Sequence, residues 1–121
     1  MKQFNLIVAG GREFNDATLM ANELTMLRRN ELADYEVNIV CGNARGADMM
    51  GAAYAGYHSL RVIEFPAQWD TFGKSAGYRR NVEMAENAQG LLAFWDGKSR
   101  GTKHMIDIAT ERGLSVRVIH Y

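Results

Sequence analysis

The sequence predicts an α/β fold in which a five-stranded parallel sheet lies between two layers of helices. Short, continuous apolar runs alternate with segments of helical periodicity along the whole chain. This is the pattern of buried parallel strands joined by crossover helices. Glycines follow the first, second and fourth apolar runs, as expected where strands turn into helices. We therefore predict a Rossmann-like three-layer sandwich, and right-handed crossovers favour the strand order 3-2-1-4-5.

The predicted strands are short runs rich in branched and aromatic residues. The first, FNLIVA, ends at two glycines, and the fourth, GLLAFW, ends at Asp96 and Gly97. Such runs of four to eight residues between turn signals are typical of buried strands. The five strands are predicted at residues 4–9, 37–41, 60–65, 90–95 and 115–120.

Four segments carry helical signals. Asp16 offers an N-cap before Met20, Leu24 and Leu27, which follow at helical spacing. Three more helices are predicted, at residues 44–58, 76–87 and 102–112, and Gly113 is expected just after the last of them. Residues 67–74 are predicted to form a loop, and Tyr78 is expected in the core rather than stacked on a base.

Length and composition favour a single domain, residues 1–121, in the cytoplasm. Cys41 is the single cysteine, so no disulfide can form within the chain. No apolar run is long enough to span a membrane, and no spacing of metal ligands is present, so we expect neither a membrane nor a metal. The formal net charge is zero, which argues against non-specific binding of nucleic acid.

Ligands of open parallel sheets bind beyond the carboxyl ends of the strands, where the strand order reverses. The first loop there is GGRE: its glycines let a ligand approach the main chain, and its arginine could pair with phosphate or be an ordinary exposed side chain. The second, GNARGAD, places an arginine between small residues at a helix start, and its aspartate could accept from a ribose hydroxyl or pair with that arginine. The candidate ligand-binding residues in these loops are Gly10, Gly11, Arg12, Gly42, Arg45, Gly46, Ala47 and Asp48.

Two further segments carry polar candidates. Arg80 and Asn81 lie in a donor-rich stretch that enters a predicted helix. The stretch DGKSRGT is a basic, hydroxyl-bearing turn that opens another helix and resembles a phosphate cradle, although its threonine could serve only as a helix cap. Trp95, Trp69 and Phe72 could line a pocket or belong to the core. The candidates in the turn are Asp96, Gly97, Lys98, Ser99, Arg100, Gly101 and Thr102.

Together, the runs GGREF, GNARGAD, AGYRRN and WDGKSRGTKHMIDIA resemble the SMF/DprA–LOG superfamily. Within it, the chain is similar to the YspA/YpsA-related branch of small stand-alone domains, often found in bacteria and phages. The resemblance covers almost the whole chain, and it implies a Rossmann-like fold with a site for nucleotides or their derivatives. The residues that match the motifs are Gly10, Gly11, Arg12, Gly42, Arg45, Gly46, Ala47, Asp48, Arg80, Asn81, Gly97, Gly101 and Thr102.

One departure bears on activity. LOG enzymes release a base from a nucleoside monophosphate and carry a PGGxGTxxE loop. The corresponding stretch here is DGKSRGTKHMID, with Met105 where the glutamate is expected. The resemblance therefore implies ligand binding more strongly than this hydrolysis.

Three hypotheses about function follow. The first is binding or sensing of a nucleotide or a nucleotide-derived ligand, with no other cofactor expected. The second is a hydrolase that cleaves an N-glycosidic or phosphoester bond of such a ligand, with Glu13, Asp48 or Asp96 as the general acid or base. The third is binding of single-stranded nucleic acid by Arg79, Arg80 and residues 98–103, which the neutral net charge disfavours. Relatives often dimerise, so a homo-oligomer is a possible assembly.

Overall fold

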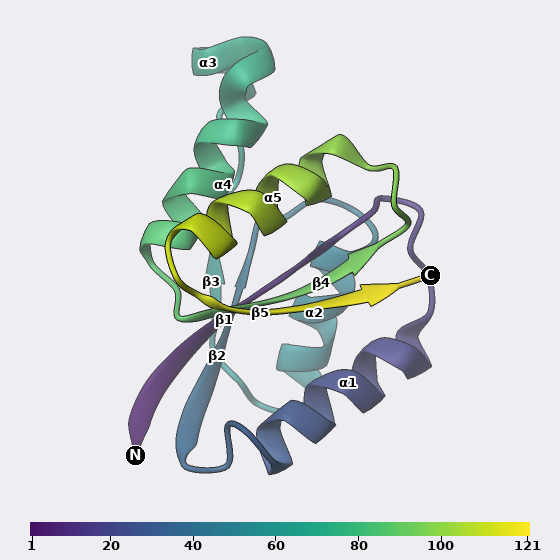
Figure 1. Cartoon of the computed structure of the whole chain (residues 1–121), viewed down its shortest axis with the longest axis vertical. Coiled ribbons are helices and arrows are strands. Elements are labelled where there is room, and N and C mark those ends of the chain that lie inside the picture. The colour runs from purple at the N-terminus through teal and green to yellow at the C-terminus, as the bar shows by residue number, and fades with distance from the viewer.

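The computed structural model describes all residues, 1–121, and contains one five-stranded sheet (Figure 1). Its strand order is β3-β2-β1-β4-β5, and every neighbouring pair is parallel. The predicted fold class and strand order are therefore confirmed. The strands are β1 (Lys2–Gly10), β2 (Tyr35–Cys41), β3 (Val62–Glu64), β4 (Gly90–Trp95) and β5 (Ser115–His120).

Two pairs of helices cover the two faces of the sheet (Figure 1). The helices α1 (Ala17–Arg29) and α2 (Ala47–Tyr57) pack on one face, and α4 (Ala76–Glu86) and α5 (Arg100–Glu111) pack on the other. The central strand β1 is buried on both sides: Leu6 and Val8 join the core under α1 and α2, while Ile7 and Ala9 join the core under α4 and α5. This explains the unbroken apolar run in the sequence. None of the helices combines the length and the apolar character that a membrane crossing requires.

The helix ends follow local chemistry. The Asp16 side chain accepts a hydrogen bond from the Leu19 amide at 3.0 Å, so the predicted cap of α1 is confirmed. The predicted start of α5 is wrong by two residues, because Ser99 caps the helix and accepts from the Thr102 amide at 3.4 Å. Gly113 follows the end of α5 with a φ of +75°, as expected of a helix-ending glycine.

The second predicted helix and the third predicted strand are both too long. The helix expected from residue 44 begins at Ala47, because Asn43 has a φ of +62° and Gly46 a φ of +81°, and neither conformation continues a helix. The strand expected at residues 60–65 is reduced to Val62–Glu64, at the edge of the sheet.

The largest corrections lie before and within α4. The predicted loop contains a short helix, α3 (Trp69–Phe72), and a 3₁₀ turn, η1 (Gly73–Ser75). Both project beyond the N-terminal end of α4 (Figure 1). The Arg79 guanidinium lies 4.3 Å from the centre of the Phe72 ring and stabilises this corner. Tyr78 is exposed, contrary to prediction, because α4 turns Asn81 and Met84 toward the sheet instead.

Two glycines of α2 provide a matched test of this packing. A β-carbon on Gly51 would lie 2.8 Å from a methyl group of Val8, whereas one on Gly56 would meet nothing. We therefore expect Gly51→Ala to destabilise the protein by about 1–3 kcal/mol through overpacking, and Gly56→Ala to stabilise it by about 0.5–1 kcal/mol. Urea unfolding measures both. Equal effects of the two substitutions would show that α2 does not lie against β1 in this way.

Candidate functional site

A cavity of about 440 Å³ lies beyond the carboxyl ends of β1 and β4. These two strands are neighbours in the sheet, but the helices that follow them cover opposite faces. The strand order therefore reverses at this point, and the loops diverge and leave a crevice. We call this space the first cavity. Segments that are distant in the sequence meet at its walls: the loop after β1, the starts of α2 and α5, one side of α4 and the last residue of the chain.

Asp48 is the buried acid of the first cavity, with a relative exposure of 5%. It belongs to the first turn of α2, and its carboxylate accepts from the Gly42 amide at 3.1 Å. Burial raises the pKa of Asp48 to about 6, although the nearby Arg80 guanidinium and the amides of Ala44 and Gly42 act in the opposite direction. The acid therefore titrates close to neutral pH.

Arg80 reaches the first cavity from α4. Its Nη1 donates to the Gly42 carbonyl at 2.8 Å, and its Nε is buried with no hydrogen-bond partner. Burial lowers the pKa of Arg80, but a guanidinium remains charged at neutral pH. A β-carbon on Gly42 would lie 2.7 Å from the Arg80 side chain, so only glycine leaves room for the arginine to cross the end of β2. Arg80 therefore lines the first cavity as a cation that is only partly paired within the protein.

Asn81 joins α4 to α5 at the side of the first cavity. Its Nδ2 donates to the Gly101 carbonyl at 3.3 Å and lies 3.1 Å from Nδ1 of His104. Burial lowers the pKa of His104, which favours the neutral ring that can accept this hydrogen bond. With the amide nitrogen fixed by two acceptors, the Asn81 side-chain oxygen remains free to accept from a ligand.

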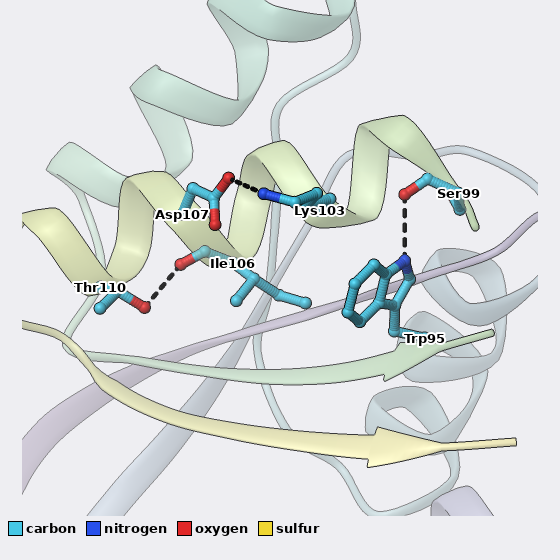
Figure 2. A network of polar contacts seen from close by, with 6 residues as sticks. All are labelled: Trp95, Ser99, Lys103, Ile106, Asp107 and Thr110. Atoms are coloured by element: carbon cyan, nitrogen blue, oxygen red, sulfur yellow. Dashed lines mark hydrogen bonds and ion pairs between the residues drawn. The ribbon is translucent and has the colours of Figure 1, made fainter. Parts of the chain in front are cut away.

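The turn before α5 uses most of its own amides. One Asp96 oxygen accepts from the amides of Lys98 and Ser99, both at 2.8 Å, and these bonds lower the pKa of Asp96. Figure 2 shows Trp95 beneath α5, with its indole N–H donating to the Ser99 carbonyl at 3.1 Å. Trp95 therefore braces the turn and does not line the first cavity, contrary to one prediction. The predicted amide cradle is largely occupied within the protein.

A second cavity of about 390 Å³ adjoins the first. The two share Arg12, Ala44 and Arg80 as walls. Arg45 lines the second cavity and pairs with Glu13 at 2.7 Å, so the predicted alternative of an Arg45–Asp48 pair is wrong. The loop after β3 and the start of α3 also line the second cavity, with Pro66, Ala67 and Trp69.

The structure gathers most of the predicted site residues around these two spaces. The residues that line the first cavity are Gly10, Gly11, Arg12, Asp48, Arg80, Asn81, Asp96, Ser99, Gly101 and Thr102. Gly42 and Arg45 line the second. Five predicted residues line neither: Gly46, Ala47, Gly97, Lys98 and Arg100. Of these, Gly46 and Ala47 pack α2 against the first loop, where the Ala47 amide donates to the Gly11 carbonyl at 3.4 Å.

Tyr121 is a site residue that the sequence prediction missed. It lines the first cavity, and its ring packs against Phe14 with the centroids 4.9 Å apart. Partial burial raises the pKa of Tyr121, and the nearby carboxylates of Asp96 and Glu13 raise it further. A signal was present in the sequence, because a residue that follows the last parallel strand must emerge at the same edge as the other loops.

The cationic patch suggested for nucleic acid is partly engaged within the protein. Lys103 pairs with Asp107 at 2.7 Å on the outer side of α5 (Figure 2). Arg79 stacks on Phe72, and Arg80 donates to the Gly42 carbonyl. These contacts reduce the charge that is free to meet phosphates along a strand.

Replacing Asp48 tests the burial of its charge. The ordinary pKa is 3.8 and the folded value is about 6, so the neutral acid favours folding and this stabilisation is lost as the pH rises through that window. Asparagine stays neutral. We therefore expect the free energy of unfolding of Asp48→Asn to rise relative to the parent protein by about 2 kcal/mol between pH ~4 and ~7.

Urea unfolding across that pH range measures the difference, and Asp34→Asn controls for the loss of an exposed carboxylate. A difference that does not change with pH would show that folding does not raise the pKa of Asp48.

Comparison with known proteins identifies the family of the chain. The family model described as "YspA, cpYpsA-related SLOG family" matches residues 4–72, more than half of the chain. The chain is also 32% identical over 120 residues to the Gene 61 protein of Mycobacterium phage D29, and the match covers 92% of each protein. The chain therefore belongs to the YspA, cpYpsA-related SLOG family.

Proposed function

We propose that the protein binds a nucleotide or a nucleotide-derived ligand in the first cavity. One observation carries the proposal: hydrogen-bond acceptors, two guanidinium groups and an apolar wall face the same space of about 440 Å³. This volume falls within the range of small-molecule sites. Membership of the SLOG family adds support, because the family resemblance implies a nucleotide-related ligand.

The apolar wall suits a base or the face of a sugar. Ala9 at the end of β1, Met84 on α4 and Met105 on α5 form this part of the first cavity. Both methionines are almost fully buried, with 1% relative exposure each. Thioether side chains are polarizable and make favourable contacts with aromatic rings, so this wall can accept a planar group.

The polar wall suits ribose hydroxyls and a negative charge. The Asp48 carboxylate and the free side-chain oxygen of Asn81 are acceptors for hydroxyl or amino groups. Arg80 supplies a buried cation whose Nε has no partner in the protein. Hydrogen bonds to charged groups contribute more than neutral ones, about 1.5–3 kcal/mol each. Binding rather than catalysis is favoured because Met105 replaces the glutamate of the related hydrolases and cannot transfer a proton.

Arg80→Lys is the direct test of this site. Lysine keeps the positive charge beside Asp48 but removes the planar set of donors. We expect AMP to bind at least about tenfold more weakly to the variant, since one charged hydrogen bond is lost. Isothermal titration calorimetry measures both affinities. Arg117→Lys is the matched control, because Arg117 pairs with Glu31 outside both cavities.

Two results would refute the proposal. One is the absence of heat and of thermal stabilisation with every nucleotide tried at millimolar concentration. The other is equal weakening of AMP binding by Arg80→Lys and Arg117→Lys, which would place the ligand elsewhere.

A second candidate function is hydrolysis of the bound nucleotide, and the pKa of Asp48 is the observation that favours it. An acid with a pKa of about 6 can hold a proton near neutral pH and give it to a leaving base. Asp96, whose pKa is lowered, also lines the cavity and could activate the water that replaces the base at the sugar carbon. These are the complementary roles that the cleavage of an N-glycosidic bond requires.

For this activity, we expect release of free base from AMP to slow above pH ~6, as Asp48 loses its proton. In Asp48→Asn, the rate should fall by about a hundredfold or more. Chromatography of the free base measures the rate, and binding of AMP by the same variant serves as the control for an intact site. Full turnover in Asp48→Asn would remove Asp48 from the reaction.

A further inference from the structure

We infer that the ligand extends through both cavities and is a nucleoside diphosphate or one of its esters, with the nucleoside in the first cavity and the pyrophosphate in the second. The inference rests on the proposed function and adds the orientation and the length of the ligand. Four observations carry it: the division of charge between the cavities, their shared walls, the two arginines that line both and the aromatic side of the second cavity.

Charge is divided unequally between the two spaces. The first cavity contains three carboxylates, those of Glu13, Asp48 and Asp96, against the guanidinium groups of Arg12 and Arg80. The second cavity contains Arg12, Arg80 and also Arg45, with no carboxylate among its lining residues. Arg45 pairs with Glu13 of the first cavity, both side chains are exposed, and a ligand phosphate would take the place of that carboxylate. A phosphate in the first cavity would face several like charges, whereas in the second it would face cations. Repulsion between like charges at close range therefore selects the second cavity for the anion.

The two cavities adjoin at three residues. Arg12 and Arg80, together with Ala44, line both spaces. Burial lowers the pKa of Arg80, and the Arg12 charge lowers it further, as expected of two nearby cations. A ligand that occupies both cavities would therefore pass close to these two arginines. A pyrophosphate suits this position because it carries charge on both phosphates and accepts paired hydrogen bonds from arginine.

Trp69 gives the second cavity an aromatic side. It is half exposed, and its ring lies 3.5 Å from the position that a β-carbon would take on Gly77, at the start of α4. The Arg79–Phe72 stack holds the short helix that carries Trp69. In a cavity that three arginines also line, this indole offers a flat face to a sugar or a second ring beyond the pyrophosphate.

Calorimetry with adenosine, AMP, ADP and inorganic pyrophosphate tests the inference. We expect ADP to bind at least about tenfold more tightly than AMP. Arg45→Gln should remove most of this advantage and leave the affinity for adenosine unchanged. Arg29→Gln is the matched control, since it removes the same charge at the end of α1, away from both cavities. ADP should also change the fluorescence of the parent protein, and this change should be lost in Trp69→Phe.

The outcomes separate the two proposals. If adenosine and AMP bind but ADP binds no more tightly than AMP, the proposed function stands and the inference is overturned. Equal weakening of adenosine and ADP by Arg45→Gln also overturns it. If no nucleoside or nucleotide binds, the proposed function fails. In that case, Arg45-dependent binding of pyrophosphate would still support an anion site in the second cavity. If pyrophosphate does not bind either, the anion site is overturned together with the proposed function.

Discussion

The main chain of Gly42 binds both a buried acid and a buried cation. Its N–H donates to Asp48 at 3.1 Å, and its carbonyl accepts from Arg80 at 2.8 Å. The two charged groups therefore share one peptide residue as a partner, and they form no ion pair within 4.0 Å of each other. This arrangement depends on the missing side chain of Gly42, because a β-carbon would occupy the space of the arginine. It also links α4, on one face of the sheet, to the loop that starts α2 on the other face.

Charges held in this way are only partly compensated. Burial raises the pKa of Asp48 and lowers that of Arg80, so each side chain would gain from a partner that complements its charge. A buried ion pair in direct contact would satisfy both groups and leave little for a ligand. Here the Arg80 Nε has no partner within the protein, and both side chains line the first cavity. A ligand in the first cavity can therefore supply the complementary charge that Asp48 and Arg80 lack within the protein.

The fold could be predicted from the sequence because its main signals are strong and local. Continuous apolar runs identify strands that are buried on both faces, and the crossover rule then leaves few strand orders. The errors arose where long-range contacts decide the structure. The helix at Trp69–Phe72 depends on stacking between Phe72 and Arg79, which no local pattern reveals. Tyr78 was misplaced because apolar spacing favoured it for the core, whereas α4 buries Asn81, which bonds across to α5.

The loops of the site could be predicted, but the sequence did not reveal which of their amides already have hydrogen-bond partners within the protein. Glycine-rich turns at the strand ends suggested that free amides would bind phosphate, yet Asp96 and the Ser99 hydroxyl already accept from three of the amides around the start of α5. Tyr121 was missed because its place depends on the path of the last strand. Since these amides are occupied, affinity for an anion must come mainly from guanidinium groups. Arginines on three separate elements, at positions 12, 45 and 80, surround the junction of the two cavities. An anion at this edge of the sheet would therefore be bound mainly by side chains that the fold brings together, and not by the amides of the glycine-rich turns.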